Sequence, residues 1–248
     1  MTQQVNVSGV RRLEVCVDRL SDAKSAVGSG ADRIELCASL ALGGVTPSLG
    51  CILGAVKLMA PVIVLIRPTL GGFCYHQLEV SQMIDDIKFV KEAGLAGVAI
   101  GALTADDTLD VEVMHRLCDA AGDMEIVLHR AFDLVSDPKR TLDEAVDLGV
   151  MRVLTSGQKP KAIDGLGCLR NLVDHADGRI EILPGSGVTP DNAVALIEGT
   201  GVTQLHSSCR APVTPDSNLV ALGFSPEKDA ALDVGLVKLM KSRLEVVQ

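Results

Sequence analysis

Two short segments of this chain carry the same pattern of reactive side chains. Residues 12–16 read Arg-Leu-Glu-Val-Cys, and residues 33–37 read Arg-Ile-Glu-Leu-Cys. Successive side chains of a β-strand point to opposite faces, so the Arg, Glu and Cys of each segment share the face opposite the two aliphatic residues. If the segments form neighbouring strands, two glutamates and two cysteines meet in one interior.

Cys16 and Cys37 are the candidate metal ligands of that interior. Neighbouring strands lie about 4.8 Å apart, which places two thiolates around a single ion. Two thiolates suit Cu(I), a soft ion that accepts few ligands, better than structural zinc, which takes four. The alternative is that both cysteines are free thiols that fill the interior as small apolar side chains.

Other polar residues and glycines end or follow further aliphatic runs. They are Arg67, His129, Arg130, Asp133, Thr155, Ser156, Gly185, Ser186, Gly187, His206, Ser207 and Ser208. Burying charges is costly unless they are paired, so a core built only for stability would hold Val, Ile or Leu at many of these positions. The concentration of polar groups therefore predicts a functional site.

Acid/base catalysis or hard-metal binding is one use of such a site. The candidate catalytic residues are Glu14, Glu35, Arg67, His129, Arg130, Asp133 and His206. They suit an isomerase, epimerase or lyase acting on a small phosphorylated or carboxylated substrate. We expect Glu14 and Glu35 to lie one layer below the thiols and to be kept charged by Arg67 or Arg130. The alternative is a purely structural network of arginines and glutamates.

Eight aliphatic runs alternate with helical patterns and must position these residues. The runs are residues 13–17, 33–37, 62–67, 97–101, 125–130, 152–155, 180–184 and 203–206. Helices are expected at residues 47–60, capped by Thr46, and at 77–93, 110–121, 138–148, 162–176, 190–198 and 226–244. Repeated βα units with near-continuous apolar strands predict an α/β fold, a single-domain (β/α)₈ TIM barrel. A Rossmann-like sheet is the alternative, but no Gly-x-Gly-x-x-Gly follows the first run.

The whole chain is interpreted as one domain, because no composition shift or linker divides residues 1–248. Residues 1–11 are a polar N-terminal lead-in, and residues 209–225 are expected to form a long loop after the eighth strand.

In a TIM barrel, chemistry occurs at the C-terminal ends of the strands. Residues 185–187 follow the seventh run and Ser207 follows the eighth, where many barrels hold a phosphate with backbone N–H groups and hydroxyls. Thr155 and Ser156 add hydroxyls after the sixth run. These residues predict a small anionic or phosphorylated ligand, although glycines at such positions also serve as tight turns.

Composition excludes several other classes of function. Aromatic residues are only 2% of the 248 residues and the formal net charge is −9, which argues against nucleic-acid and anionic-membrane partners. We find no signal-peptide pattern and no apolar run of the roughly 20 residues that a membrane span needs, so we expect a cytoplasmic protein. The seven cysteines are an odd number and form no Cys-x-x-Cys pair, which indicates free thiols.

A set of motifs matches one known family in order. The motifs are residues 13–16, 31–37, 43–48, 66–68, 129–133, 152–157, 184–188 and 206–208. As a set they resemble the CutC copper-homeostasis family. The resemblance implies a cytoplasmic TIM barrel that forms a homo-oligomer and binds Cu(I), for buffering or delivery, through cysteines that match Cys16 and Cys37.

Two segments depart from the family pattern. Residues 69–73 read Thr-Leu-Gly-Gly-Phe where the family usually has Arg-Gly-Gly-Asp before the Phe, so one Arg and one Asp are missing after the third run. Past Cys209, residues 216–220 replace a loop that usually bears Arg and Asn. A ligand that depends on those groups would not be held here in the usual way.

Overall fold

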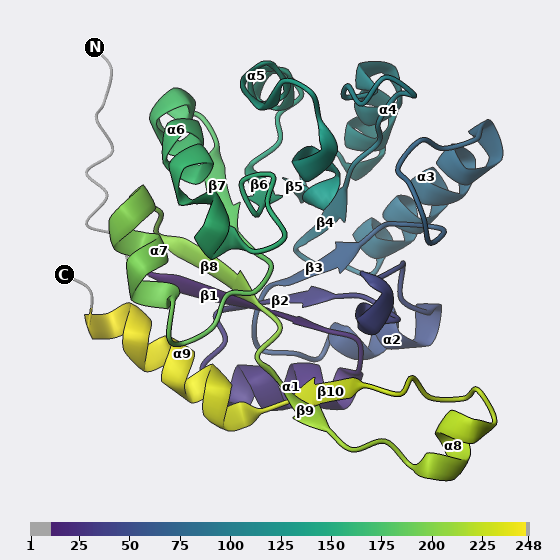
Figure 1. Cartoon of the computed structure of the whole chain (residues 1–248). Helices are drawn as coiled ribbons and strands as arrows, with labels where there is room; N and C mark the ends of the chain where they lie inside the picture. The colour runs from purple at the N-terminus through teal and green to yellow at the C-terminus, as the bar shows by residue number, and fades with distance from the viewer. Residues whose placement is uncertain (1–10, 247–248) are drawn as a thin grey trace.

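Eight parallel strands form a nearly closed barrel with helices on its outside (Figure 1). The computed structural model describes residues 11–246, so residues 1–10 of the predicted lead-in lie outside the described residues. The strands are β1 Arg12–Val17, β2 Arg33–Leu36, β3 Val62–Leu65, β4 Gly97–Ile100, β5 Glu125–Leu128, β6 Arg152–Thr155, β7 Glu181–Pro184 and β8 Gln204–Ser207. Their order is β7-β6-β5-β4-β3-β2-β1-β8. The predicted TIM barrel is confirmed.

Helices α1 to α7 connect successive barrel strands, and several of them begin at a residue whose side chain caps the first turn. The helices are α1 Leu20–Gly28, α2 Leu49–Ala55, α3 Gln77–Glu92, α4 Val111–Ala121, α5 Pro138–Asp147, α6 Leu166–Ala176, α7 Ala193–Thr200, α8 Ser217–Ala221 and α9 Val234–Val246, with 3-10 turns η1 Leu40–Leu42, η2 Arg130–Leu134 and η3 Ala162–Gly165. Asp137, for example, accepts from the Arg140 N–H with Pro138 at the first helical position. Among residues 11–246, no helix has both the length and the apolar character that a membrane span requires.

Helix α2 begins later and ends earlier than predicted. Ser48, not Thr46, is its N-cap and accepts a hydrogen bond from the Cys51 N–H. Thr46 is instead tied to the end of β3, because its hydroxyl accepts from the Arg67 N–H and its own N–H donates to the Arg67 carbonyl. Thr46 therefore joins the loop after β2 to the C-terminal end of β3.

The predicted loop at residues 209–225 and the predicted start of the last helix at residue 226 are wrong. Strand β9, Arg210–Val213, pairs antiparallel with β10, Asp229–Leu232, and α8 lies between them. Residues 210–232, called the arm below, extend away from the barrel in Figure 1. The last helix starts only at Val234, where the Asp233 side chain accepts from the Gly235 and Leu236 N–H groups.

The barrel interior is a small core, separate from the larger one between strands and helices. It holds Cys16, Cys37, Ile63, Leu65, Ala99, Val127, Leu154 and Leu183. The alternate residues of the same strands, such as Val15, Ile34 and Val64, pack outward against the helices. The inward orientation predicted for Cys16 and Cys37 is thus confirmed, and the period-two pattern of the strands is its cause.

Candidate functional site

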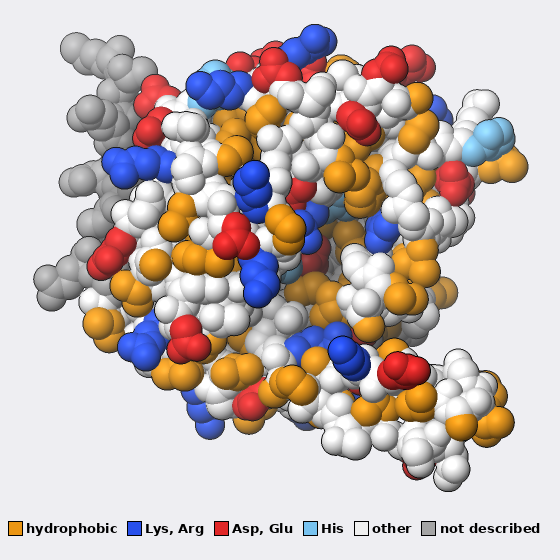
Figure 2. Space-filling model, in the orientation of Figure 1, with side chains coloured by type: hydrophobic (Ala, Val, Ile, Leu, Met, Phe, Trp, Pro, Cys, Tyr) orange, Lys and Arg blue, Asp and Glu red, His pale blue; other side chains and the backbone are white. Residues whose placement is uncertain are grey.

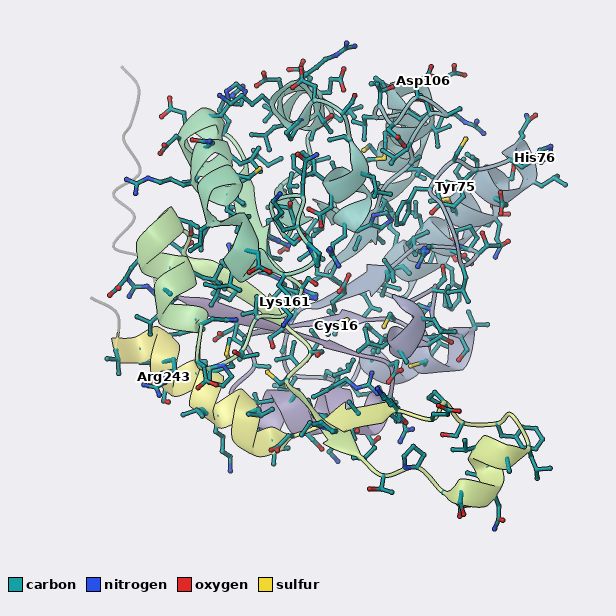
Figure 3. The ribbon with its side chains drawn as sticks, in the orientation of Figure 1. Cys16, Tyr75, His76, Asp106, Lys161 and Arg243 are labelled. Carbon is teal, nitrogen blue, oxygen red and sulfur yellow. The ribbon has the colours of Figure 1, made fainter. Side chains whose placement is uncertain are left out.

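A cavity of about 650 Å³ lies at the C-terminal ends of the barrel strands. Figure 2 shows the hollow near the middle of the view, above the arm. Figure 3 shows Cys16 at the centre of the barrel, whereas Tyr75 and His76 lie far from it, next to α3. The predicted residues that line the cavity from the strand ends are Cys16, Glu35, Cys37, Arg67, His129, His206 and Ser207, and those that line it from the following segments are Arg130, Ser186, Gly187 and Ser208.

Cys16 and Cys37 meet at the base of this cavity. Their sulfur atoms are 4.0 Å apart, and both side chains are buried. The stagger of the barrel places Cys16 level with Glu35 rather than with Cys37, so the thiols are diagonal neighbours and not the matched pair that the sequence suggested. The hydrogen bond with Cys37, burial and the charge of Glu35 together raise the pKa of Cys16 well above its ordinary value. An incoming cation must therefore displace a proton from this thiol.

Glu14 lies below the thiols and is fully paired. Arg33 Nε donates to its carboxylate, and His206 Nδ1 lies 2.8 Å from its other oxygen. Arg33 is fixed in turn by Gln204, whose side-chain carbonyl accepts from Nη2 at 2.7 Å. Burial alone would raise the pKa of Glu14, but the His206 hydrogen bond and the Arg33 charge outweigh it and lower the pKa to about 2. Glu14 is therefore an ionised anchor behind the cavity wall.

His206 connects Glu14 to Glu35. Its Nε2 lies 3.4 Å from a Glu35 carboxylate oxygen. Burial lowers the pKa of His206, but the charges of Glu35 and Glu14 more than compensate and raise it overall. Burial and the nearby Glu14 charge raise the pKa of Glu35, against the opposing effect of His206. Two buried groups with shifted proton affinities thus share the cavity wall.

The same wall contains a group of atoms able to hold a metal ion. Cys16 Sγ, a Glu35 oxygen and a His206 ring nitrogen all lie within 4.8 Å of one another. His206 uses one ring nitrogen for the Glu14 carboxylate and turns the other toward Glu35, an arrangement that commonly orients metal-binding histidines.

The predicted pairing of Glu14 and Glu35 with Arg67 or Arg130 is wrong. Arg33, on β2 beside β1, forms the ion pair with Glu14. Arg67 instead donates to the Gly44 and Gly71 carbonyls at 2.9 and 2.6 Å, and its guanidinium lies over the Phe73 ring. Arg67 thereby holds together the loops that follow β2 and β3.

Arg130 and Asp133 organise the loop after β6. Arg130 Nε donates to Asp133 Oδ2 at 2.7 Å, and the same carboxylate accepts from the Thr155 hydroxyl and the Ser156 N–H at 2.5 and 3.0 Å. Of these residues only Arg130 lines the cavity. The other three, Asp133, Thr155 and Ser156, lie behind the cavity wall and position the loop. They are close to strand ends in the sequence but do not reach the cavity surface.

Three of the residues predicted to hold a phosphate, Ser186, Gly187 and Ser207, line the cavity, but the two serine hydroxyls already donate hydrogen bonds elsewhere. Ser186 Oγ donates to the Pro160 carbonyl and Ser207 Oγ donates to the Val188 carbonyl, each at 2.8 Å. Gly187 has φ +65°, and a Cβ there would lie 2.9 Å from the Lys161 side chain. Gly185 does not line the cavity but admits the close approach of Leu154 and His206. Phosphate binding stays a prediction.

Gln204 and Phe73 are among the residues of the site that the sequence analysis did not predict. Gln204 lies two residues before His206 on β8 and shares its face, so the period-two pattern marks it as an interior polar residue. Phe73 lines the cavity and contacts His129, with 5.0 Å between ring centroids. It is one of only four phenylalanines in the chain, but nothing local in the sequence predicts that contact.

The CutC family model matches residues 11–211. This chain belongs to the CutC family. A CutC family protein of Rhizobium meliloti (strain 1021) is 43% identical over 234 residues, which cover 94% of this chain and 96% of that protein. A CutC family protein of Pasteurella multocida (strain Pm70) is 39% identical over 241 residues, covering 94% and 99%.

A solved CutC structure has the same barrel. The CutC protein of Streptococcus agalactiae, provisionally assigned to copper homeostasis, is 35% identical with a TM-score of 0.77, covering 80% of this chain and 98% of that one. Phosphoribosylanthranilate isomerase of Thermotoga maritima, 14% identical, matches with a TM-score of 0.58 over 95% of this chain and 98% of its own. At that identity the similarity shows a common barrel fold alone.

Proposed function

We propose that this CutC-family protein binds one Cu(I) ion at the ends of β1, β2 and β8 and thereby buffers or delivers copper. The observation that carries the proposal is the 4.0 Å separation of Cys16 Sγ and Cys37 Sγ. A metal–thiolate bond is about 2.3 Å long, so a single ion fits between two sulfurs at this separation. Thiolates are ligands that Cu(I) prefers over hard oxygen donors.

His206 is the third ligand in this proposal. Its Nε2 faces the group formed with Cys16 and Glu35, while Glu14 fixes the ring through Nδ1. Cu(I) loading releases protons, because the Cys16 thiol, which has a raised pKa, must become a thiolate; coordination also requires the unprotonated form of His206 Nε2, and the raised pKa of His206 opposes that form. The provisional copper assignment of the Streptococcus agalactiae relative agrees with this choice of metal.

Anaerobic titration with Cu(I) in the presence of a competing chelator tests the copper site. We expect one tightly bound ion in the native protein and a loss of affinity of at least about tenfold in Cys16→Ser and in Cys37→Ser, since a hydroxyl is a poor ligand for a soft ion. Cys74→Ser is the matched control, because Cys74 is exposed and does not line the cavity. Equal affinity in all four proteins would eliminate the site.

A second candidate function is turnover of a small organic substrate, and the Glu35 to His206 contact favours it. A carboxyl group and an imidazole 3.4 Å apart, both with shifted pKa values, form an acid/base pair in a cavity of the size that small-molecule sites have. An isomerase, epimerase or lyase would use them to move a substrate proton. Conversion of phosphorylated or carboxylated sugars by the native protein, abolished in Glu35→Gln, is the expected result. A cytoplasmic location and a homo-oligomeric state stay predictions.

A further inference from the structure

Two hydrogen-bond donors at the cavity have no partner within the described residues. Arg67 Nε and His129 Nε2 are both buried and unbonded. Neither atom is reachable by water in this conformation, so solvent does not satisfy them either. Buried polar groups are nearly always paired, and an exception in a cavity calls for a functional reason. Both side chains line the same cavity.

His129 is held as a neutral ring that donates from Nε2. Its Nδ1 accepts a hydrogen bond from the Ala131 N–H at 3.2 Å, which requires a lone pair on Nδ1 and leaves the proton on Nε2. Burial and the Arg67 charge lower the pKa of His129 to about 3, so the ring is uncharged at neutral pH. The result is a fixed N–H donor.

Arg67 is held just as firmly. Its Nη1 and Nη2 donate to the Gly44 and Gly71 carbonyls, and these two bonds fix the plane of the guanidinium. Nε has no acceptor within hydrogen-bond distance, and the Tyr75 hydroxyl, which interacts with the same guanidinium, is also buried without a partner. Arg67 and His129 together therefore offer one positive charge and two immobile N–H donors at the cavity wall.

The ring of Phe73 contacts both donors' side chains. Its centroid is 4.9 Å from Arg67 Cζ and 5.0 Å from the His129 ring centroid. Phe73 follows Gly71, whose φ is +103°, and Gly72, and neither glycine has a neighbour that a Cβ would meet within 4 Å. The exposed, glycine-containing segment gives the backbone before Phe73 freedom to shift, so that the ring can leave its partly buried position against the core.

We propose that Arg67 Nε and His129 Nε2 together bind the carboxylate of a small organic acid, and that the Phe73 ring moves aside as the acid enters. A carboxylate brings one negative charge and two oxygens, which one guanidinium charge and two N–H donors match. A phosphate dianion carries more charge and more acceptor oxygens than this pair satisfies. The site does not depend on the copper proposal, and it names the substrate class for the second candidate function.

Calorimetric titration of metal-free, chelator-treated protein tests the pair. The probes are malonate, pyruvate and citrate, with inorganic phosphate as the competing chemistry. We expect at least one carboxylate to bind, and to bind about tenfold or more weakly in Arg67→Lys and in His129→Asn. Lysine keeps the charge without Nε, and asparagine keeps an acceptor for the Ala131 N–H without reaching the position of Nε2. His115→Asn on the exposed face of α4 is the matched control.

Two spectroscopic readouts separate binding from a merely structural role. In protein with ¹⁵N-labelled histidine, the Nε2–H signal of His129 should shift on addition of the bound acid, whereas that of His115 should not. The chain contains no Trp, so Phe73→Trp supplies a single tryptophan whose emission, excited selectively over that of Tyr75, should change on binding, and Phe224→Trp on the exposed arm serves as its control. Carboxylate binding retained in Cys16→Ser would show that the pair works without the copper site.

Three results would overturn the proposal. One is the absence of binding by all three acids at millimolar concentration. Another is equal affinity in the native protein and in both variants while thermal unfolding shows that the variants are folded. The third is binding of phosphate alone, which would assign the pair to a different ligand.

Discussion

The two sides of the barrel interior differ sharply in chemistry. Strands β3 to β7 contribute an apolar side made of Ile63, Leu65, Ala99, Val127, Leu154 and Leu183. Strands β1, β2 and β8 contribute a polar side made of Glu14, Cys16, Arg33, Glu35, Cys37, Gln204 and His206. The apolar side gains stability from burial, whereas each charge on the polar side is tolerable only because a neighbour neutralises it. A side that costs stability is where function is expected to reside.

A second set of polar residues lies at the N-terminal end of the barrel, on strands β5 to β8. Gln204 Nε2 donates to Glu181, and Arg152 reaches both Glu181 and Glu125. The carboxylates at this end are partly exposed, unlike the nearly inaccessible Glu14. The comparison therefore predicts different responses of the two sides to mutation, pH and metal.

The largest expected effect comes from breaking the polar side at Glu14. Glu14→Leu leaves Arg33 as a buried cation without its carboxylate partner and should lower the free energy of unfolding by about 3 to 5 kcal/mol. Urea unfolding at pH 7 measures this loss. The exposed Arg140 and Glu144 pair is the control, since Glu144→Leu should cost less than about 1 kcal/mol. Similar losses in both variants would mean that the polar side is not strained by its charges.

A cavity on the apolar side should cost somewhat less and leave ligand binding intact. Leu183 is fully buried in the interior core but does not line the functional cavity. Leu183→Ala should lower the free energy of unfolding by about 3 kcal/mol, through lost burial and the void that remains. Cu(I) stoichiometry should be unchanged. A variant that loses copper as well as stability would contradict the separation of the two sides.

Acid should destabilise the protein through His129 before it reaches Glu14. The pKa of His129 falls from 6.5 to about 3 on folding. Its contribution to the free energy of unfolding is therefore fully present above pH 6.5 and is lost as pH falls toward 3. The contribution of Glu14, with a folded pKa of about 2, is present above pH 4.5 and is lost as pH falls toward 2. Between pH 6.5 and 4.5, His129 should account for about 2 to 3 kcal/mol.

Unfolding free energies across that pH window check the His129 prediction. The His129→Asn variant should lack most of the dependence that the native protein shows. Glu35, whose pKa is raised, acts in the opposite direction in both proteins, so it does not affect the difference between them. Parallel pH profiles would show that His129 is not held neutral.

The smallest expected effect belongs to Cys37, which lies where the two sides meet. In metal-free protein, Cys37→Ala removes one buried heavy atom and should cost only about 1 kcal/mol. With saturating Cu(I), the native protein should gain stability by mass action and the variant should not. Thermal unfolding with and without the ion measures both. Equal stabilisation of the two proteins by copper would place the ion elsewhere.

Much of the barrel was predictable because it depends on local periodicity. The eight strand segments follow from apolar runs, and the inward orientation of Cys16 and Cys37 follows from the alternation of side chains along each strand. The copper and anion sites were predicted only as residue lists. The order of residues in the sequence did not show which of them would line one cavity. His129 lines it, for example, whereas Asp133 does not.

By itself, the sequence determined the strands, the faces of their side chains and the presence of a polar set at their C-terminal ends, since these properties repeat within a few residues. Tertiary structure alone decided that Cys16 lies level with Glu35, that Arg33 rather than Arg67 neutralises Glu14, and that residues 210–232 fold into an arm. The stagger between strands, the reach of a long side chain and the pairing of distant strands depend on closure of the whole barrel, which no short stretch of residues encodes.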